Sequence, residues 1–176
     1  MKKKISGILL AILTITSMIP VFAATSESTI KKDDTVKSQE VIVSYDVGEN
    51  YTVTIPANFG LALENEATPI LVSASNVKIA AGNKLKVTMT STNGYDSGYK
   101  VTYKDSDIGY WIKKGASQDN INTEVTGATV EVLSVDSGIT TDATYLKFYT
   151  TTDEIAGATQ AGAHEDTLTF TCGIEQ

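Results

Sequence analysis

The stretch KLKVTMTST, Lys84–Thr92, decides the fold class. Leu85, Val87 and Met89 alternate in it with lysine and threonine, and a period of two places alternate side chains on opposite faces of a strand. The dipeptide Asn93-Gly94 follows at once and is typical of tight hairpin turns. The sequence therefore predicts a β-strand with one apolar face, ended by a turn.

The same alternation occurs on both sides of this strand. Upstream, EVIVSYDV (40–47) and YTVTIP (51–56) are separated by Gly48-Glu49-Asn50, which predicts a strand, a turn and a strand. Pro56 ends the second strand, because proline has no N–H to donate to a ladder. Downstream, the series continues with YKVTYK, GYWIKK, ATVEVLSV, TYLKFYTT and DTLTFTCGI.

The last of these segments closes the chain. Its predicted apolar face consists of Leu168, Phe170, Cys172 and Ile174. The whole series amounts to roughly ten strand candidates with polar or glycine-bearing connections, which indicates an antiparallel sandwich or barrel. These connections are too short for the crossover helices of a parallel sheet. We therefore expect an all-β domain over residues 40–176, folded as an antiparallel immunoglobulin-like (Greek-key) β-sandwich.

Two segments compete as helices. NFGLALENEA (58–67) has room for a turn or two, and TDEIAGATQAGA (152–163) for a short helix weakened by Gly157 and Gly162. Neither is long enough to organise the fold.

The N-terminus has the pattern of an export signal. Basic residues 2–4 precede an apolar run, 5–13, and the small residues Ala23 and Ala24 follow at the expected cleavage site. A membrane anchor is the alternative, but polar residues and Pro20 interrupt the run, which is shorter than the roughly 20 residues of a span. We expect a signal peptide over residues 1–23, and a mature chain that is secreted or associated with the cell surface, with no membrane insertion.

Residues 24–39 are polar and charged, which predicts a flexible leader in front of the domain. Without residues 1–23 the chain has 11 lysines, no arginine and 21 acidic residues, hence a net charge of −10. Nucleic-acid surfaces need clustered Lys and Arg, so nucleic acid is not an expected partner. The single cysteine, Cys172, is predicted to be a small buried hydrophobe, with an intermolecular disulfide as the alternative.

Catalytic and metal-binding patterns are scarce in this sequence. A nucleophile–base pair would need His164 and Cys172 to face the same cleft, and no Gly-x-Ser-x-Gly elbow occurs. Asp105 and Asp107 form a fragment of calcium-loop spacing, but a third side-chain ligand and a closing Glu are missing. A solvated acidic turn is the competing interpretation. We expect no enzyme, no cofactor and no resident metal.

Trp111 and the eight tyrosines suggest a carbohydrate surface, because aromatic faces stack on sugar rings. Several of these tyrosines, however, lie at period-two positions inside strand candidates, where packing in the core or at its rim is the commoner role. The two interpretations stay open at this point.

Three pieces of the sequence carry a resemblance: ENYTVTIPANFGL, GNKLKVTMTSTNGY and AGAHEDTLTFT. Together they resemble small secreted surface proteins of low-GC Gram-positive bacteria, and the closing pattern is similar to that of spore coat protein U-like and fimbrial subunits. The resemblance implies structural subunits, adhesins or coat proteins rather than enzymes. It assigns an early strand and a last turn with its strand to Tyr51, Val53, Ile55, Pro56, Ala161, Gly162, Asp166, Leu168 and Phe170. It departs at His164, where these proteins often have tyrosine.

The expected function is that of a secreted, non-catalytic structural or adhesion protein of the cell surface, whose partners are other subunits or surface components. A fimbria-like or coat subunit that assembles through β-strand contacts is the sharper version, with a homo-oligomer as one outcome. Val41, Val43, Tyr45 and Val47 alternate as a donor strand would, although the segment also suits the first strand of its own domain. The alternative function is an extracellular carbohydrate-binding module that uses Trp111 and surface tyrosines.

Overall fold

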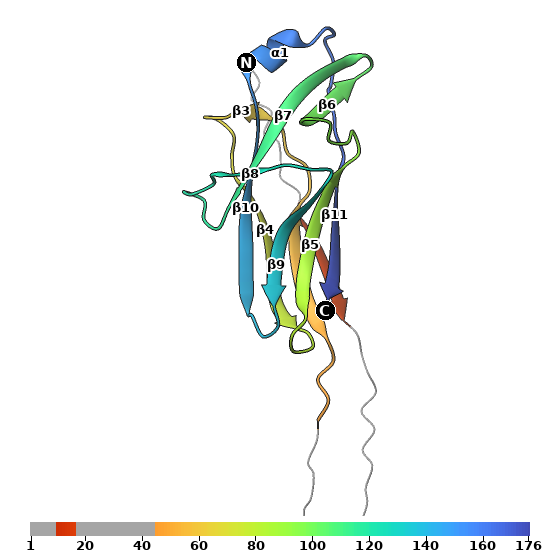
Figure 1. Ribbon diagram of the computed structural model, residues 1–176, viewed down its shortest axis with the longest axis vertical. Coiled ribbons are helices and arrows are strands. Elements are labelled where there is room, and N and C mark those ends of the chain that lie inside the picture. The colour runs from red at the N-terminus through yellow and green to blue at the C-terminus, as the bar shows by residue number, and fades with distance from the viewer. Residues whose placement is uncertain (1–9, 17–44) are drawn as a thin grey trace, which may run out of the picture.

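The computed structural model describes residues 10–16 and 45–176, which form two facing β-sheets and one short helix (Figure 1). The larger sheet has the order β1-β2-β4-β10-β7-β6, with β3 beside β10 and β8 beside β7; the smaller has the order β11-β5-β9. The larger sheet contains β1 (Leu10–Thr16), β2 (Asn50–Pro56), β3 (Ala62–Leu63), β4 (Ile70–Lys78), β6 (Tyr99–Tyr103), β7 (Ser106–Gly115), β8 (Thr123–Val125) and β10 (Thr141–Thr150). The smaller contains β5 (Lys84–Ser91), β9 (Thr129–Asp136) and β11 (Leu168–Glu175), and the helix is α1 (Thr152–Gly157).

The pairing of these strands confirms the all-β prediction. All the ladders are antiparallel except the two-residue contact between β3 and β10, which is parallel. The strand predicted first, β5, lies in the middle of the smaller sheet, and its Leu85, Val87 and Met89 are buried as expected. They pack in one core with inward-facing residues of the larger sheet, among them Val53, Val72, Ile112, Leu146 and Phe148.

Two strands depart from strict alternation. In β4, Val72 and Ala74 point inward, and Asn76 then adopts φ 54°, after which Val77 returns to the core. Asparagine is among the few residues that tolerate this left-handed conformation. In β9 the register against β5 shifts between Val87 and Thr88, and the adjacent Val132 and Leu133 are both buried. A bulge thus adds one apolar side chain to the core.

The N-terminal part of the domain differs from the prediction. Residues 45–49 form no strand, so the expected strand–turn–strand unit is not present in the part that the structure describes; residues 40–44 lie outside the described residues. Asn50–Pro56 does form the predicted second strand. Most of the predicted signal peptide and the leader at 24–39 also lie outside the described residues, but Leu10–Thr16 forms β1 and pairs with β2.

The two helix candidates have different outcomes. α1 forms over Thr152–Gly157, where the Thr151 hydroxyl caps it by accepting the Glu154 N–H. It ends at Gly157, consistent with the low helix propensity of glycine. The segment at 58–67 forms no helix: it contains β3 and a turn in which the Glu66 and Ala67 N–H groups donate to the Leu63 carbonyl.

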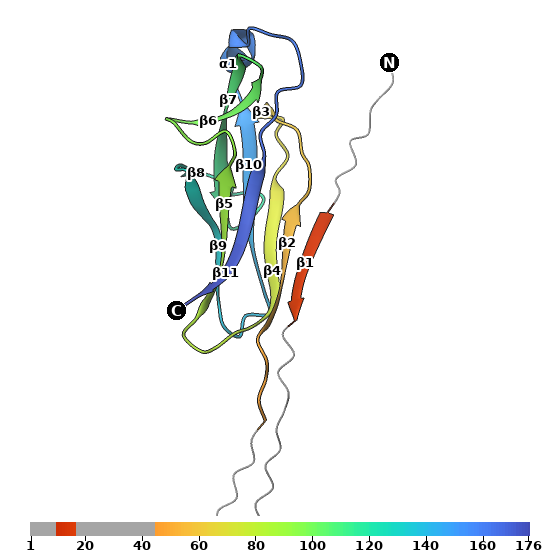
Figure 2. The same ribbon diagram turned by 90° about the vertical axis from the view of Figure 1, so that its right-hand side faces the viewer.

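The sandwich is unevenly covered on its two sides. On β5 the apolar face is fully buried, whereas the apolar face of the neighbouring β11 is only half-buried along its whole length. β11 is an edge strand of the smaller sheet, and at the facing edge of the larger sheet lie β2 and then β1 (Figure 2). The core is therefore open on the side between β2 and β11.

Paired alanine substitutions test this unevenness. Leu85 and Ile174 are register partners on β5 and β11, yet Leu85 is fully buried and Ile174 is half-buried. We expect Leu85→Ala to lower the free energy of unfolding by about 2–5 kcal/mol through lost transfer energy and a cavity. Ile174→Ala should cost less than about 2 kcal/mol, because much of its side chain already meets solvent. Urea unfolding measures both, and equal losses would contradict an open side.

Candidate functional site

The open side of the sandwich holds a groove of about 840 Å³. One wall is the end of β2 and the chain that follows it, 55–61, and the other is the segment that enters β11, 162–168. The groove is lined by apolar side chains and by polar ones. The apolar lining includes Ile55, Phe59, Tyr110, Phe148, Leu168 and Phe170, and the polar lining includes Asn58, Thr150, His164, Glu165 and Asp166.

β2 borders this groove and is covered on its outer edge by β1. The ladder is antiparallel and runs from Leu10 opposite Pro56 to Thr16 opposite Asn50, so every residue of β2 has a partner in β1 (Figure 2). On its other edge β2 pairs with β4, also antiparallel. The strand that completes the sheet thus comes from the segment predicted to be the core of the signal peptide.

The five residues before β2 form an arm, which we define as Tyr45–Glu49. Figures 1 and 2 show the arm running on from the start of β2, beyond the end of the sandwich. Tyr45 is 79% exposed and Val47 is 61% exposed, which makes them the most exposed large hydrophobic residues in the described part of the chain. Two predicted donor residues are therefore uncovered here, and Val41 and Val43 lie outside the described residues.

A carboxylate in the groove lining joins two strands, β5 and β7, to the segment that enters β11. Asp166 Oδ2 accepts the Ser91 hydroxyl at 2.8 Å and the Tyr110 hydroxyl at 2.6 Å, while Oδ1 accepts the Asn93 N–H at 3.2 Å. Ser91 ends β5, Asn93 begins the following turn and Tyr110 lies in β7, so this carboxylate ties the two sheets together. Burial, and then the bond to Asp166, hold the pKa of Tyr110 far above its ordinary value.

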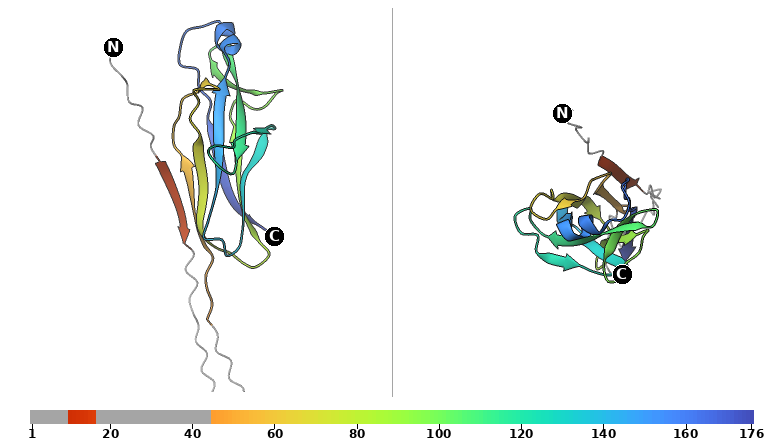
Figure 3. Two further views of the ribbon diagram at one scale, coloured as in Figure 1. Left: turned by 90° about the vertical axis from the view of Figure 1, so that its left-hand side faces the viewer. Right: turned by 90° about the horizontal axis from the view of Figure 1, so that it is seen from above.

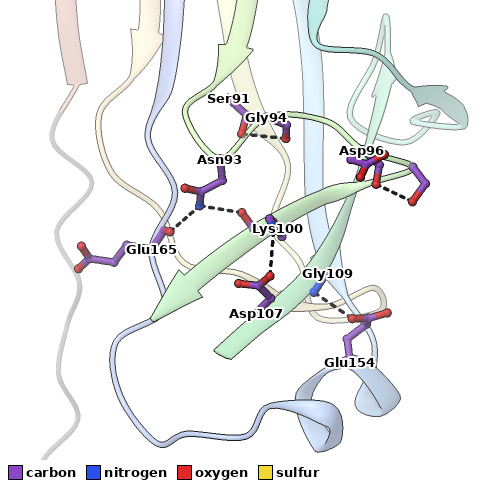
Figure 4. A network of polar contacts seen from close by, with 10 residues as sticks. Ser91, Asn93, Gly94, Asp96, Lys100, Asp107, Gly109, Glu154 and Glu165 are labelled. Atoms are coloured by element: carbon purple, nitrogen blue, oxygen red, sulfur yellow. Dashed lines mark hydrogen bonds and ion pairs between the residues drawn. The ribbon is translucent and has the colours of Figure 1, made fainter. Parts of the chain in front are cut away.

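The turn after β5 extends this network. The Asn93 side-chain amide donates to the carbonyls of Lys100 and Glu165 at 3.0 and 2.9 Å (Figure 4). Thr102 of β6 exchanges two backbone hydrogen bonds with Glu165, each 3.0 Å long. The segment that enters β11 is therefore bound to β6, which closes this end of the sandwich and leaves the β2 side open.

Among the described residues, His164 and Ser106 make a contact that resembles a catalytic pair. His164 Nε2 lies 2.9 Å from the Ser106 hydroxyl. That hydroxyl is almost fully buried, and it also accepts the N–H groups of Thr159 and Gln160 at 3.0 and 3.3 Å. With its lone pairs taken by two amides, the hydroxyl donates to the imidazole. The arrangement fixes the chain between α1 and β11, and it offers no exposed nucleophile.

Trp111 lies on the outer face of the larger sheet, away from the groove, with 37% of its surface exposed. Its ring stacks on Tyr149 at 6.0 Å between centroids, and the Lys113 ammonium lies 5.0 Å from the centre of the same tyrosine ring. Tyr149 is buried, so Trp111 is the ring of this stacked pair that is exposed to solvent. The carbohydrate hypothesis for Trp111 stays a prediction.

The acidic turn and the cysteine occupy ordinary positions. Asp107 pairs with Lys100 at 2.9 Å across the β6–β7 hairpin (Figure 4). Asp105 lies in the turn of this hairpin. In residues 10–16 and 45–176 no three His, Cys, Asp or Glu side chains gather as a metal site. Cys172 is a free thiol, half-buried opposite Val87, and burial raises its pKa.

The comparisons with known proteins add no assignment: no protein family, curated protein or solved structure matches this chain. In the described part of the chain, no helix has the length and apolar character needed to cross a bilayer. The features that bear on function are therefore the groove, the β2 edge and the arm. Figure 3 shows β2 and the arm from the side opposite to Figure 2 and from above.

Removing the charge of Asp166 tests the tie between the sheets. Because bonds to a charged acceptor contribute about 1.5–3 kcal/mol each, we expect Asp166→Asn to lower the free energy of unfolding by at least about 2 kcal/mol. Glu165→Gln is the matched control, because the hydrogen bonds of Glu165 described above are made by its backbone. Urea unfolding at neutral pH compares them. A variant as stable as the control would contradict the role of this carboxylate.

The buried phenol of Tyr110 predicts a loss of stability in alkali. Its pKa is raised in the folded state, so its contribution is complete below the unfolded pKa of about 10 and is lost as the pH rises above that value. Tyr99 acts in the same direction, with a pKa raised by burial to about 12. We expect Tyr110→Phe to flatten the decline of stability above pH ~10. Unfolding curves across this range measure it, with Tyr45→Phe as the exposed control, and an unchanged slope would contradict the assignment.

Proposed function

We propose that this chain is a secreted, non-catalytic structural or adhesion protein of the cell surface that assembles with other subunits by adding a β-strand to β2. The observation that carries the proposal is the occupied outer edge of β2. The strand on that edge, β1, belongs to the predicted signal peptide over residues 1–23. Its removal on export leaves the edge in need of a new strand.

An uncovered β2 has a physical reason to recruit one. Without β1, its outward backbone N–H and C=O groups have no ladder partner, and such an edge is a template for pairing with another chain. The groove beside β2 adds apolar surface from Ile55 and Phe59, and from Phe170 on the opposite wall. Main-chain hydrogen bonds and apolar pockets are the two components of recognition by strand addition.

The donor in this proposal is the segment 41–47, which consists of the first three residues of the arm and the four residues before it. Its odd-numbered residues Val41, Val43, Tyr45 and Val47 alternate with polar residues at 44 and 46. Tyr45 and Val47 lie in solvent in the single chain, where large apolar side chains gain most from being covered. This arrangement corresponds best to fimbria-like or coat subunits, which fold as immunoglobulin-like sandwiches.

The arm supplies a direct test. We expect the exported chain to associate as its concentration rises, and Val43→Ser/Tyr45→Ser/Val47→Ser to remain monomeric. The melting temperature of this variant should be unchanged, because Tyr45 and Val47 are exposed in the single chain. Ile42→Ser/Asp46→Ser is the matched control at even-numbered positions of the same segment. Sedimentation velocity measures the association.

The salt dependence of this association is a second test of the proposal. Subunits with a net charge of −10 repel one another, so added NaCl should strengthen association. An exported chain that stays monomeric at every concentration and salt level would contradict the proposed assembly. A triple variant that associates like the parent would show that another surface is responsible.

A further inference from the structure

We infer that the arm is exchanged reciprocally between two inverted copies of this chain, so that strand addition at β2 forms a closed two-fold pair rather than an open fibre. This inference rests on the proposed function and names the partner and the symmetry of the same edge. It follows from the direction of the arm and the polarity of the strand that β2 accepts.

The direction of the arm is the first observation. Tyr45–Glu49 lead into Asn50, the first residue of β2, and the views of Figures 1 and 2 show them continuing from β2 past the end of the sandwich. The arm and β2 therefore run in the same chain direction. Two residues, Gly48 and Glu49, separate Val47 from β2, and this link spans about 10 Å at most when extended.

The polarity of the accepted strand is the second observation. β1 lies antiparallel on the outer edge of β2 over all seven residues, and β4 lies antiparallel on the inner edge. Antiparallel pairing is also slightly more stable per residue than parallel pairing. We therefore take the incoming arm to bind in the same sense as β1.

These two observations fix the symmetry. An arm that runs in the direction of its own β2 pairs antiparallel only with a β2 that runs the opposite way, so the acceptor copy is inverted. The arm of that inverted copy then points back along the β2 of the first. Both arms are used, each patch meets its own equivalent, and the interface is isologous and closed. Copies related by translation would instead pair the arm parallel to β2.

The sequence also suits this symmetry. The odd-numbered positions from Val41 to Ile55 are apolar or aromatic except for Glu49, and Gly48 lies at their centre. A two-fold axis at Gly48 places Val47 opposite Glu49 next to the axis. Farther out it places Val41 opposite Ile55, Val43 opposite Val53 and Tyr45 opposite Tyr51, and these three are pairs of apolar or aromatic residues, which stabilise antiparallel ladders. An axis one residue later would place the two Glu49 side chains opposite each other, which like charges disfavour.

Paired cysteines test the register and the symmetry together. In the exported chain with Cys172→Ala, the axis at Gly48 places Ser44 of one copy opposite Thr52 of the other. We expect Ser44→Cys/Thr52→Cys to oxidise to a covalent dimer with two disulfides, seen by non-reducing electrophoresis and intact mass. Ser44→Cys/Thr54→Cys is the control shifted by two residues and should crosslink several-fold less. Sedimentation of the parent chain should show monomer and dimer, with nothing larger.

Three other results would each overturn the inference, and each has a different consequence for the proposed function. A ladder of trimers and larger species would show an open chain of subunits, which contradicts the closed pair and leaves assembly through strands standing. A disulfide within a monomer would show that residues 41–47 fold back on their own β2, which contradicts both proposals. No disulfide, with the parent chain dimeric in sedimentation, would contradict this register and symmetry and place the dimer contact elsewhere.

Discussion

The proposed assembly depends on one constraint, the backbone hydrogen-bonding groups on the outer edge of β2. A sheet edge beside an open apolar groove must be covered, and β1 covers it here over the full length of β2. Export without residues 1–23 would remove this cover while leaving the sandwich itself intact, because β1 contributes no other ladder. The proposed assembly is then the replacement of one antiparallel strand by another.

Different interactions stabilise the two sides of the sandwich. Within the groove lining, Asp166 accepts hydrogen bonds from β5, the turn after it and β7, and Asn93 donates to the backbone carbonyls of Lys100 and Glu165. Such bonds are directional and hold one geometry. The β2 side has no equivalent tie among the described residues, and its apolar surface is less specific. The hydrogen-bonded entry of β11 would keep the shape of the subunit, while the apolar β2 side could accept a strand from another copy.

Local periodicity predicted much of this fold and little of its site. Alternation identified β5 and β11, because apolar and polar side chains lie on opposite faces of each strand. It overestimated the burial of Phe170, because nothing in the sequence shows which strands lie at the edge of a sheet. The Ser91 contact with Asp166 spans 75 residues, and no spacing rule reaches that far. Alternation alone predicted Tyr45 and Val47 as donor residues, whereas their exposure required the structure.

Amide hydrogen exchange of the exported chain tests the central claim most directly. If the arm of one copy covers the β2 of another, peptides from 41–49 and from 50–56 should gain protection together at high protein concentration and lose it together on dilution. Peptides from β5, in the closed core, should not change. Protection of 50–56 that is independent of concentration, or association that leaves 41–49 exchanging freely, would contradict the account.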